Sequence, residues 1–164
     1  MLKVENLNKT YRTGNNTYPV LKNLSFQVKK GEFVAVMGPS GSGKTTLLNC
    51  ISCFIPHDSG KIILNRKDIS GLNEEQLAKI RNRHLGFVFQ DFMLLDGLTV
   101  FENICLPQVI AAKPAAQMEA KAEKFCEAFG ITKIRDKYPA EISGGEKQRT
   151  AVARALMNTP YILL

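Results

Sequence analysis

The clearest chemical signal in this sequence is a glycine-rich octapeptide, Gly38-Pro39-Ser40-Gly41-Ser42-Gly43-Lys44-Thr45. It matches G-x-x-x-x-G-K-[ST], a pattern typical of loops that hold the phosphates of nucleoside triphosphates. The glycines let the backbone point several N–H groups at one spot, and the N-terminus of a following helix adds positive potential there. Lys44 can reach the β- and γ-phosphates, and the Thr45 hydroxyl can bind Mg²⁺. The octapeptide therefore predicts a site for a nucleotide with Mg²⁺.

The segments on either side of the octapeptide agree with this prediction, because the motif needs a strand before it and a helix after it. Residues 32–37 read as a buried strand, and we expect a helix from about residue 44 to residue 54. A glycine-rich turn that binds no phosphate is the alternative, and the flanking segments disfavour it. We assign the nucleotide contacts to the octapeptide and to Thr46, which follows it.

The remaining pattern divides the chain into a strand-rich part and a helical part. Alternating or apolar stretches predict strands at residues 2–7, 24–28, 61–64 and 85–89, and a capped helix begins near residue 73. Beyond residue 90 we expect three helices: residues 99–112, disturbed at Pro107; a helix from Pro114 to Gly130; and a helix after Ser143. Residues 161–164 read as the start of another strand.

These elements predict one α/β domain over residues 1–164. A β-rich core with the phosphate loop covers about residues 1–90, a helical subdomain covers about 91–158, and residues 159–164 begin a further strand. The hydrophobic content of 45% and the charged content of 23% are ordinary for a globular domain. The longest apolar run, residues 33–37, is far shorter than the ~20 residues of a membrane span.

The charge and the N-terminal sequence narrow the class of protein further. The formal net charge is +7, from 22 basic and 15 acidic residues, but the basic residues are scattered and no basic stripe with interleaved aromatics occurs. We therefore expect no nucleic-acid partner. The first residues lack the apolar segment of a signal peptide, so we expect a cytoplasmic chain whose link to a membrane comes through a partner.

Two of the four cysteines, Cys50 and Cys53, form a C-x-x-C pattern that can indicate a metal or redox site. They fall among Leu47, Ile51 and other apolar residues at helical spacing. We therefore interpret them as small buried thiols on an apolar helix face.

A second motif, Ser143-Gly144-Gly145-Glu146, precedes the last predicted helix. Alone, such a stretch is typical of a plain helix-entry loop. Paired with the phosphate loop, and followed by residues 147–156, it makes the whole chain resemble the ATP-binding-cassette ATPases. Their signature is typically L-S-G-G-Q, and this chain has Ile142 and Glu146 in place of the leucine and the glutamine. The resemblance implies a P-loop nucleotide triphosphatase core with an antiparallel β subdomain and an inserted helical subdomain.

The resemblance also assigns roles to single residues. Tyr11 matches the aromatic that stacks on adenine, although an ordinary surface aromatic at a strand end is the alternative. Gln90 matches the glutamine that senses Mg²⁺ and the attacking water and that links the site to the membrane subunit. Ser143, Gly144, Gly145 and Glu146 match the signature, which completes the ATP site of a second cassette.

Within the family, residues 83–95 and 135–145 look like the cassettes of lipoprotein release, macrolide export and antimicrobial-peptide resistance of the bacitracin-export type. This implies an ATPase that couples ATP binding and hydrolysis to export or removal of a peptide or lipophilic substrate by a membrane permease. Two identical cassettes would clamp two ATP molecules head to tail, at the inner face of the membrane. A non-transport cassette that acts as an assembly or tethering module is the alternative.

The chain departs from the family after residues 161–164, where cassettes continue with an aspartate for Mg²⁺ and a glutamate that activates water. This sequence contains neither those acids nor the later switch histidine, and it looks like the first two-thirds of a cassette. We therefore expect this chain alone to bind nucleotide and to hydrolyse it poorly or not at all, because losing a general base typically costs about 10²–10⁴-fold in rate.

Overall fold

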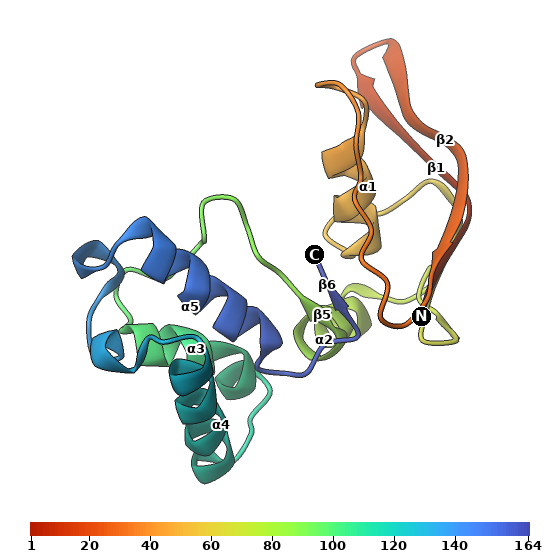
Figure 1. The fold of residues 1–164 in the computed structure, drawn as a ribbon. Coiled ribbons are helices and arrows are strands. Elements are labelled where there is room, and N and C mark those ends of the chain that lie inside the picture. The colour runs from red at the N-terminus through yellow and green to blue at the C-terminus, as the bar shows by residue number, and fades with distance from the viewer. The chain divides into compact units, whose positions relative to one another are not determined.

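A long antiparallel hairpin forms the N-terminal part of the protein in a computed structural model that describes residues 1–164. Its strands are β1 (Leu2–Thr13) and β2 (Asn16–Val28), drawn in red and orange in Figure 1. The turn between them contains Gly14 at φ +58°, a conformation that glycine adopts without steric cost. The strands predicted at residues 2–7 and 24–28 are therefore confirmed, and both are longer than expected.

The hairpin belongs to a four-stranded antiparallel sheet of order β2-β1-β3-β4. The strands β3 (Ser59–Leu64) and β4 (Lys67–Asp68) complete it, and β1 pairs with both β2 and β3. Helix α1 (Lys44–Ile51) buries Leu47, Cys50 and Ile51. It ends three residues earlier than predicted, and Cys53 then takes a left-handed conformation at φ +61° that no longer continues the helix.

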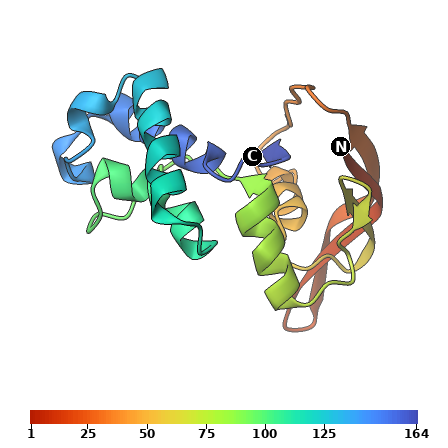
Figure 2. The same cartoon turned by 90° about the horizontal axis from the view of Figure 1, so that it is seen from below.

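Most remaining elements are helical. Figures 1 and 2 show α3 (Val100–Ile110), α4 (Ala115–Ala128) and α5 (Gly144–Leu156) grouped together, with short 3₁₀ turns η1 (Thr132–Ile134) and η2 (Pro139–Glu141) between α4 and α5. The three predicted helices are confirmed, and α3 runs through Pro107. Their shared core consists of Val100, Ile104, Cys105, Ala122, Cys126, Ile131, Ile134, Ile142, Ala153 and Met157.

The chain separates into two compact units, Met1–Ala78 and Lys79–Leu164, and helix α2 (Glu74–His84) crosses this boundary. The predicted division near residue 90 stays a prediction. In the second unit β5 (Leu85–Gly86) pairs in parallel with β6 (Ile162–Leu163). The strand predicted over residues 85–89 is thus shorter, although Val88 N–H still donates to the Leu164 carbonyl at 2.8 Å. None of the helices combines the length and apolar character needed to cross a bilayer.

The buried strand predicted at residues 32–37 is wrong. The segment has no strand pairing, and its apolar side chains are exposed, with Phe33 at 98% and Met37 at 87% of their full accessible surface. An apolar run becomes a buried strand only where other strands and a covering layer pair with it and pack against it. The sheet of its own unit, of order β2-β1-β3-β4, does not include this segment.

Asn103 is a fully buried polar residue of α3 whose side chain holds the segment before the helix. Its Oδ1 accepts from Leu95 N–H at 2.8 Å. Its Nδ2 donates to the carbonyls of Leu95, Leu98 and Thr99, each at 3.0 Å. Leu95 N–H and the Leu98 carbonyl gain a partner in this way, whereas the carbonyls of Leu95 and Thr99 also accept from Leu98 N–H at 3.1 Å and from Asn103 N–H at 2.9 Å.

We expect Asn103→Ala to lower the free energy of unfolding by about 1–3 kcal/mol, because it removes the side-chain partner of Leu95 N–H and of the Leu98 carbonyl. Urea denaturation followed by circular dichroism measures the change. The matched control is Gln117→Ala, an exposed amide on α4 that should change stability by less than about 0.5 kcal/mol. Equal stability of the two variants would contradict this role of Asn103.

Candidate nucleotide site

The loop of residues 38–45 leads directly into α1, and Gly43 is the residue at which the helix begins. Gly43 has φ +92°, and a Cβ atom there would lie 2.9 Å from Val20 Cγ1 and 3.3 Å from the Val20 carbonyl oxygen. Both the backbone conformation and the close approach of β2 therefore require glycine at this position. This glycine aligns the loop with the first turn of the helix, as the motif predicts.

Lys44 reaches back over the loop that precedes it. Its Nζ donates to the carbonyls of Gly38 at 2.8 Å and of Pro39 at 2.7 Å. An ammonium group has three donors, so one remains for an anion after these two contacts. The lysine charge is thus held against the loop by main-chain oxygens.

The first turn of α1 supplies further donors. No side chain caps this helix, and its first α-helical hydrogen bond runs from Leu47 N–H to the Gly43 carbonyl at 2.8 Å. The N–H groups of Lys44, Thr45 and Thr46 have no acceptor in the preceding turn. Unpaired N–H groups, a hydroxyl and an ammonium are the donor set that phosphate groups require, and the exposed Thr45 hydroxyl suits Mg²⁺. The residues present therefore fit a nucleotide with Mg²⁺.

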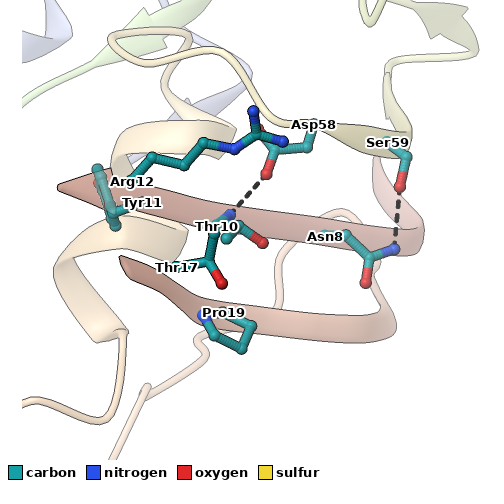
Figure 3. A pocket seen from close by; sticks show the side chains of 8 residues that line it. All are labelled: Asn8, Thr10, Tyr11, Arg12, Thr17, Pro19, Asp58 and Ser59. Atoms are coloured by element: carbon teal, nitrogen blue, oxygen red, sulfur yellow. Dashed lines mark hydrogen bonds between the residues drawn. The ribbon is translucent and has the colours of Figure 1, made fainter. Parts of the chain in front are cut away.

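Tyr11 lies near the end of β1, opposite Tyr18 of β2. Its ring is 41% exposed, and Lys9 Nζ lies 5.6 Å from the ring centroid. Tyr11 also lines an open pocket of about 850 Å³, together with Asn8, Thr10, Arg12, Thr17, Pro19, Asp58 and Ser59 (Figure 3). The exposed ring at the end of the hairpin is available for stacking, and its role toward adenine stays a prediction.

Asp58 organises the wall of this pocket. Its carboxylate accepts from Thr10 N–H at 2.6 Å and from Lys9 Nζ at 3.3 Å, and Figure 3 shows the Arg12 side chain extending toward it. Partial burial opposes ionisation, but these hydrogen bonds and the nearby cations outweigh it and lower the pKa of Asp58. The sequence analysis missed this residue, because a single aspartate in a loop carries no recognisable spacing.

The signature residues form the N-terminus of α5. The Ser143 hydroxyl accepts from Glu146 N–H at 3.4 Å, and the Glu146 carboxylate accepts from both the N–H and the hydroxyl of Ser143 at 2.7 Å. This reciprocal arrangement is a capping box. The N–H groups of Gly144 and Gly145 remain without an acceptor in the preceding turn. The predicted anion site at this helix end therefore already contains the carboxylate that the Glu146 replacement introduces.

Gln90 lies in a turn that follows β5 and is exposed. The turn belongs to the same unit as the signature, whereas the phosphate loop and Tyr11 belong to the other unit. The sequence analysis missed a contact in this turn: Arg154 of α5 donates to the carbonyls of Phe92 and Met93, at 2.6 and 2.5 Å. The sequence signal was an arginine three residues after Ala151 and three before Met157, a spacing that places it on the apolar face of the helix.

Cys50 and Cys53 are buried, which confirms their interpretation as small core thiols. Burial raises the pKa of the Cys50 thiol, so the group is held in its neutral form. Cys50 lies on α1, whereas Cys53 lies two residues beyond its end, so the predicted apolar helix face includes only Cys50.

The Glu146 cap depends on pH. Hydrogen bonds from the Ser143 hydroxyl and N–H lower the pKa of Glu146, so the stabilisation is present above the ordinary carboxyl pKa and is lost as the pH falls through the lower folded value. We expect the Ser143 amide resonance to titrate below the ordinary glutamate pKa in an NMR series and to lose this titration in Glu146→Gln. The control Glu127→Gln, on the exposed face of α4, should leave it unchanged. A Ser143 amide that does not titrate would contradict the capping box.

Comparison with known proteins supports the same conclusion. A family model described as "ABC transporter" matches residues 21–164. The ABC transporter ATP-binding protein YxdL of Bacillus subtilis is 48% identical over all of this chain, and the bacitracin export ATP-binding protein BceA of Halalkalibacterium halodurans is 46% identical over 99% of it. The chain spans 63% and 64% of the lengths of these two relatives.

Solved structures agree in fold as well as in sequence. The ATP-binding cassette MJ0796, solved as a dimer in a post-hydrolysis state with ADP and Pi, matches with a TM-score of 0.88 and 38% identity, over 99% of this chain and 72% of that one. The α/β cassette fold expected from the resemblance is therefore confirmed. With the glycine loop at α1 and the family match over residues 21–164, the chain belongs to the ABC transporter family of ATP-binding proteins.

Proposed function

We propose that this chain binds ATP with Mg²⁺ and serves as the nucleotide-binding part of an ABC transporter, coupling ATP binding and hydrolysis to transport. The observation that carries the proposal is the Lys44 ammonium held at the uncapped N-terminus of α1, among unpaired main-chain donors. Such a donor set binds phosphate groups, and the loop motif favours those of a nucleoside triphosphate. ATP hydrolysis is the activity that follows from membership of the family.

The other predicted site residues take roles around this anchor. Tyr11 stacks on adenine, Thr45 binds Mg²⁺, and Gln90 senses the metal and the attacking water. Ser143, with the N–H groups of Gly144 and Gly145, contacts the γ-phosphate of ATP held by a second cassette. Because the Ser143 hydroxyl donates to Glu146 in this structure, it must turn away from that carboxylate to reach a phosphate.

A second copy of this chain and a membrane permease are the proposed partners. The dimeric state of MJ0796 supports pairing of two cassettes, and the name of the BceA relative supports a peptide as the exported or removed substrate. The cassette pair would then lie at the cytoplasmic face of the cell membrane, attached through the permease. This arrangement lets the γ-phosphate act as a contact that closes the pair and is lost on hydrolysis.

We expect Lys44→Ala to weaken ATP binding by about 10- to 150-fold, because charge-assisted hydrogen bonds contribute about 1.5–3 kcal/mol. Isothermal titration calorimetry with Mg-ATP measures the dissociation constant. Lys124→Ala, which removes one exposed positive charge from α4, is the control and should bind as the unsubstituted chain does. Unchanged affinity in Lys44→Ala would overturn the assignment of the loop.

The transport role is tested by the proteins that co-purify with the cassette. In mild detergent, we expect a membrane permease to co-purify with the unsubstituted protein. It should also co-purify with Lys44→Ala, because that substitution affects the nucleotide site alone. A stable complex with soluble proteins and no permease would favour an assembly or tethering module instead.

A further inference from the structure

The turn after Gln90 has an unusual backbone. Phe92 and Met93 are consecutive non-glycine residues in the left-handed region, at φ +59° and φ +49°. Side chains with a Cβ rarely adopt this conformation, and it persists only where surrounding contacts hold it. The turn is therefore held in place by something other than its own conformational preference.

Arg154 supplies the first of these contacts. Its Nη2 donates to the Phe92 carbonyl at 2.6 Å and its Nη1 to the Met93 carbonyl at 2.5 Å. The side chain is half-buried, and burial lowers the pKa of its guanidinium. No carboxylate pairs with it, so the two carbonyls of the turn are its hydrogen-bond partners. The guanidinium presents its donors as a fork, so one side chain reaches both adjacent carbonyls.

Asn103 holds the next part of the same segment. Its amide pairs with both the N–H and the carbonyl of Leu95, and Leu94 packs against the core of the helical group. Residues 92–95 are thus fastened to α5 through Arg154 and to α3 through Asn103. Gln90 is separated from this fastened segment only by Asp91.

We propose that Arg154 is a positioning residue that joins the turn after Gln90 to the helix that begins at Ser143. The inference rests on the proposed function for the roles of Gln90 and Ser143, but the contact itself does not. Since α5 is a continuous helix from Gly144 to Leu156, a displacement of the turn is passed along it to the signature. A ligand whose binding shifts the position of Gln90 therefore also shifts the position of Ser143, and a ligand at Ser143 has the same effect on Gln90.

Two substitutions separate this hydrogen-bonding role from simple filling of space. Arg154→Met keeps much of the volume and removes the donors, whereas Arg154→Lys keeps a charged donor. We expect amide exchange of Phe92, Met93 and Leu95, measured by NMR without nucleotide, to rise at least about 10-fold in Arg154→Met and to return to within about threefold in Arg154→Lys. Arg149→Ala removes an exposed charge from the same helix and should change nothing in the turn.

Equal exchange in the methionine and lysine variants would overturn the proposal, since a space-filling role predicts that result. A second measurement needs no substitution. The Nη protons of Arg154 should give resolved NMR signals that are protected from exchange, because two hydrogen bonds hinder rotation of the guanidinium. The Nη proton signals of Arg149 should average to one. Averaged Arg154 signals would also overturn the proposal, even if Arg154→Met failed to fold.

The functional consequence is measured in the full-length protein. We expect Arg154→Met to keep the ATP dissociation constant within about twofold, because residues 38–46 are unchanged, and to lower kcat about 10-fold or more. A loss of affinity with unchanged kcat would overturn the positioning role. Failure of the unsubstituted protein to bind Mg-ATP would overturn the proposed function alone, since the exchange experiment uses no nucleotide.

Discussion

The unpaired N–H groups at a helix N-terminus are the physical constraint on which this structure depends. The first turn of every α-helix contains donors that the helix cannot satisfy, and a protein must supply acceptors for them. Helix α1 has no side-chain cap and begins at Gly43, where β2 approaches too closely for any side chain. Its donors remain available to a ligand, and the Lys44 ammonium adds charge beside them.

In helix α5, by contrast, side chains of the protein itself cap the first turn. Ser143 and Glu146 form a capping box, so a carboxylate of the chain itself lies at this helix end. A negative group is favourable there for the same electrostatic reason that a phosphate would be. The helix end at Gly43 can therefore bind an anion directly. At Ser143, a bound phosphate must first replace the Glu146 carboxylate.

Polar contacts within the second unit hold an irregular segment against the helices around it. The stretch between β5 and α3 has little regular pairing of its own, yet Asn103 satisfies both main-chain groups of Leu95 and Arg154 satisfies two carbonyls of the turn. Each of these side chains serves several main-chain groups. Together these two side chains hold the segment to α3 and to α5.

The sequence by itself determined those features that depend on a few neighbouring residues. Spacing alone identified the glycine loop from Gly38 to Thr45 and the helix beginning after Ser143, because glycine conformation and helix capping are local. Tertiary structure decided whatever depends on distant partners. Residues 32–37 carry the pattern of a buried strand but are exposed, since burial requires neighbours that no local pattern reports. Arg154 likewise shows its role only once the fold brings α5 against the turn after Gln90.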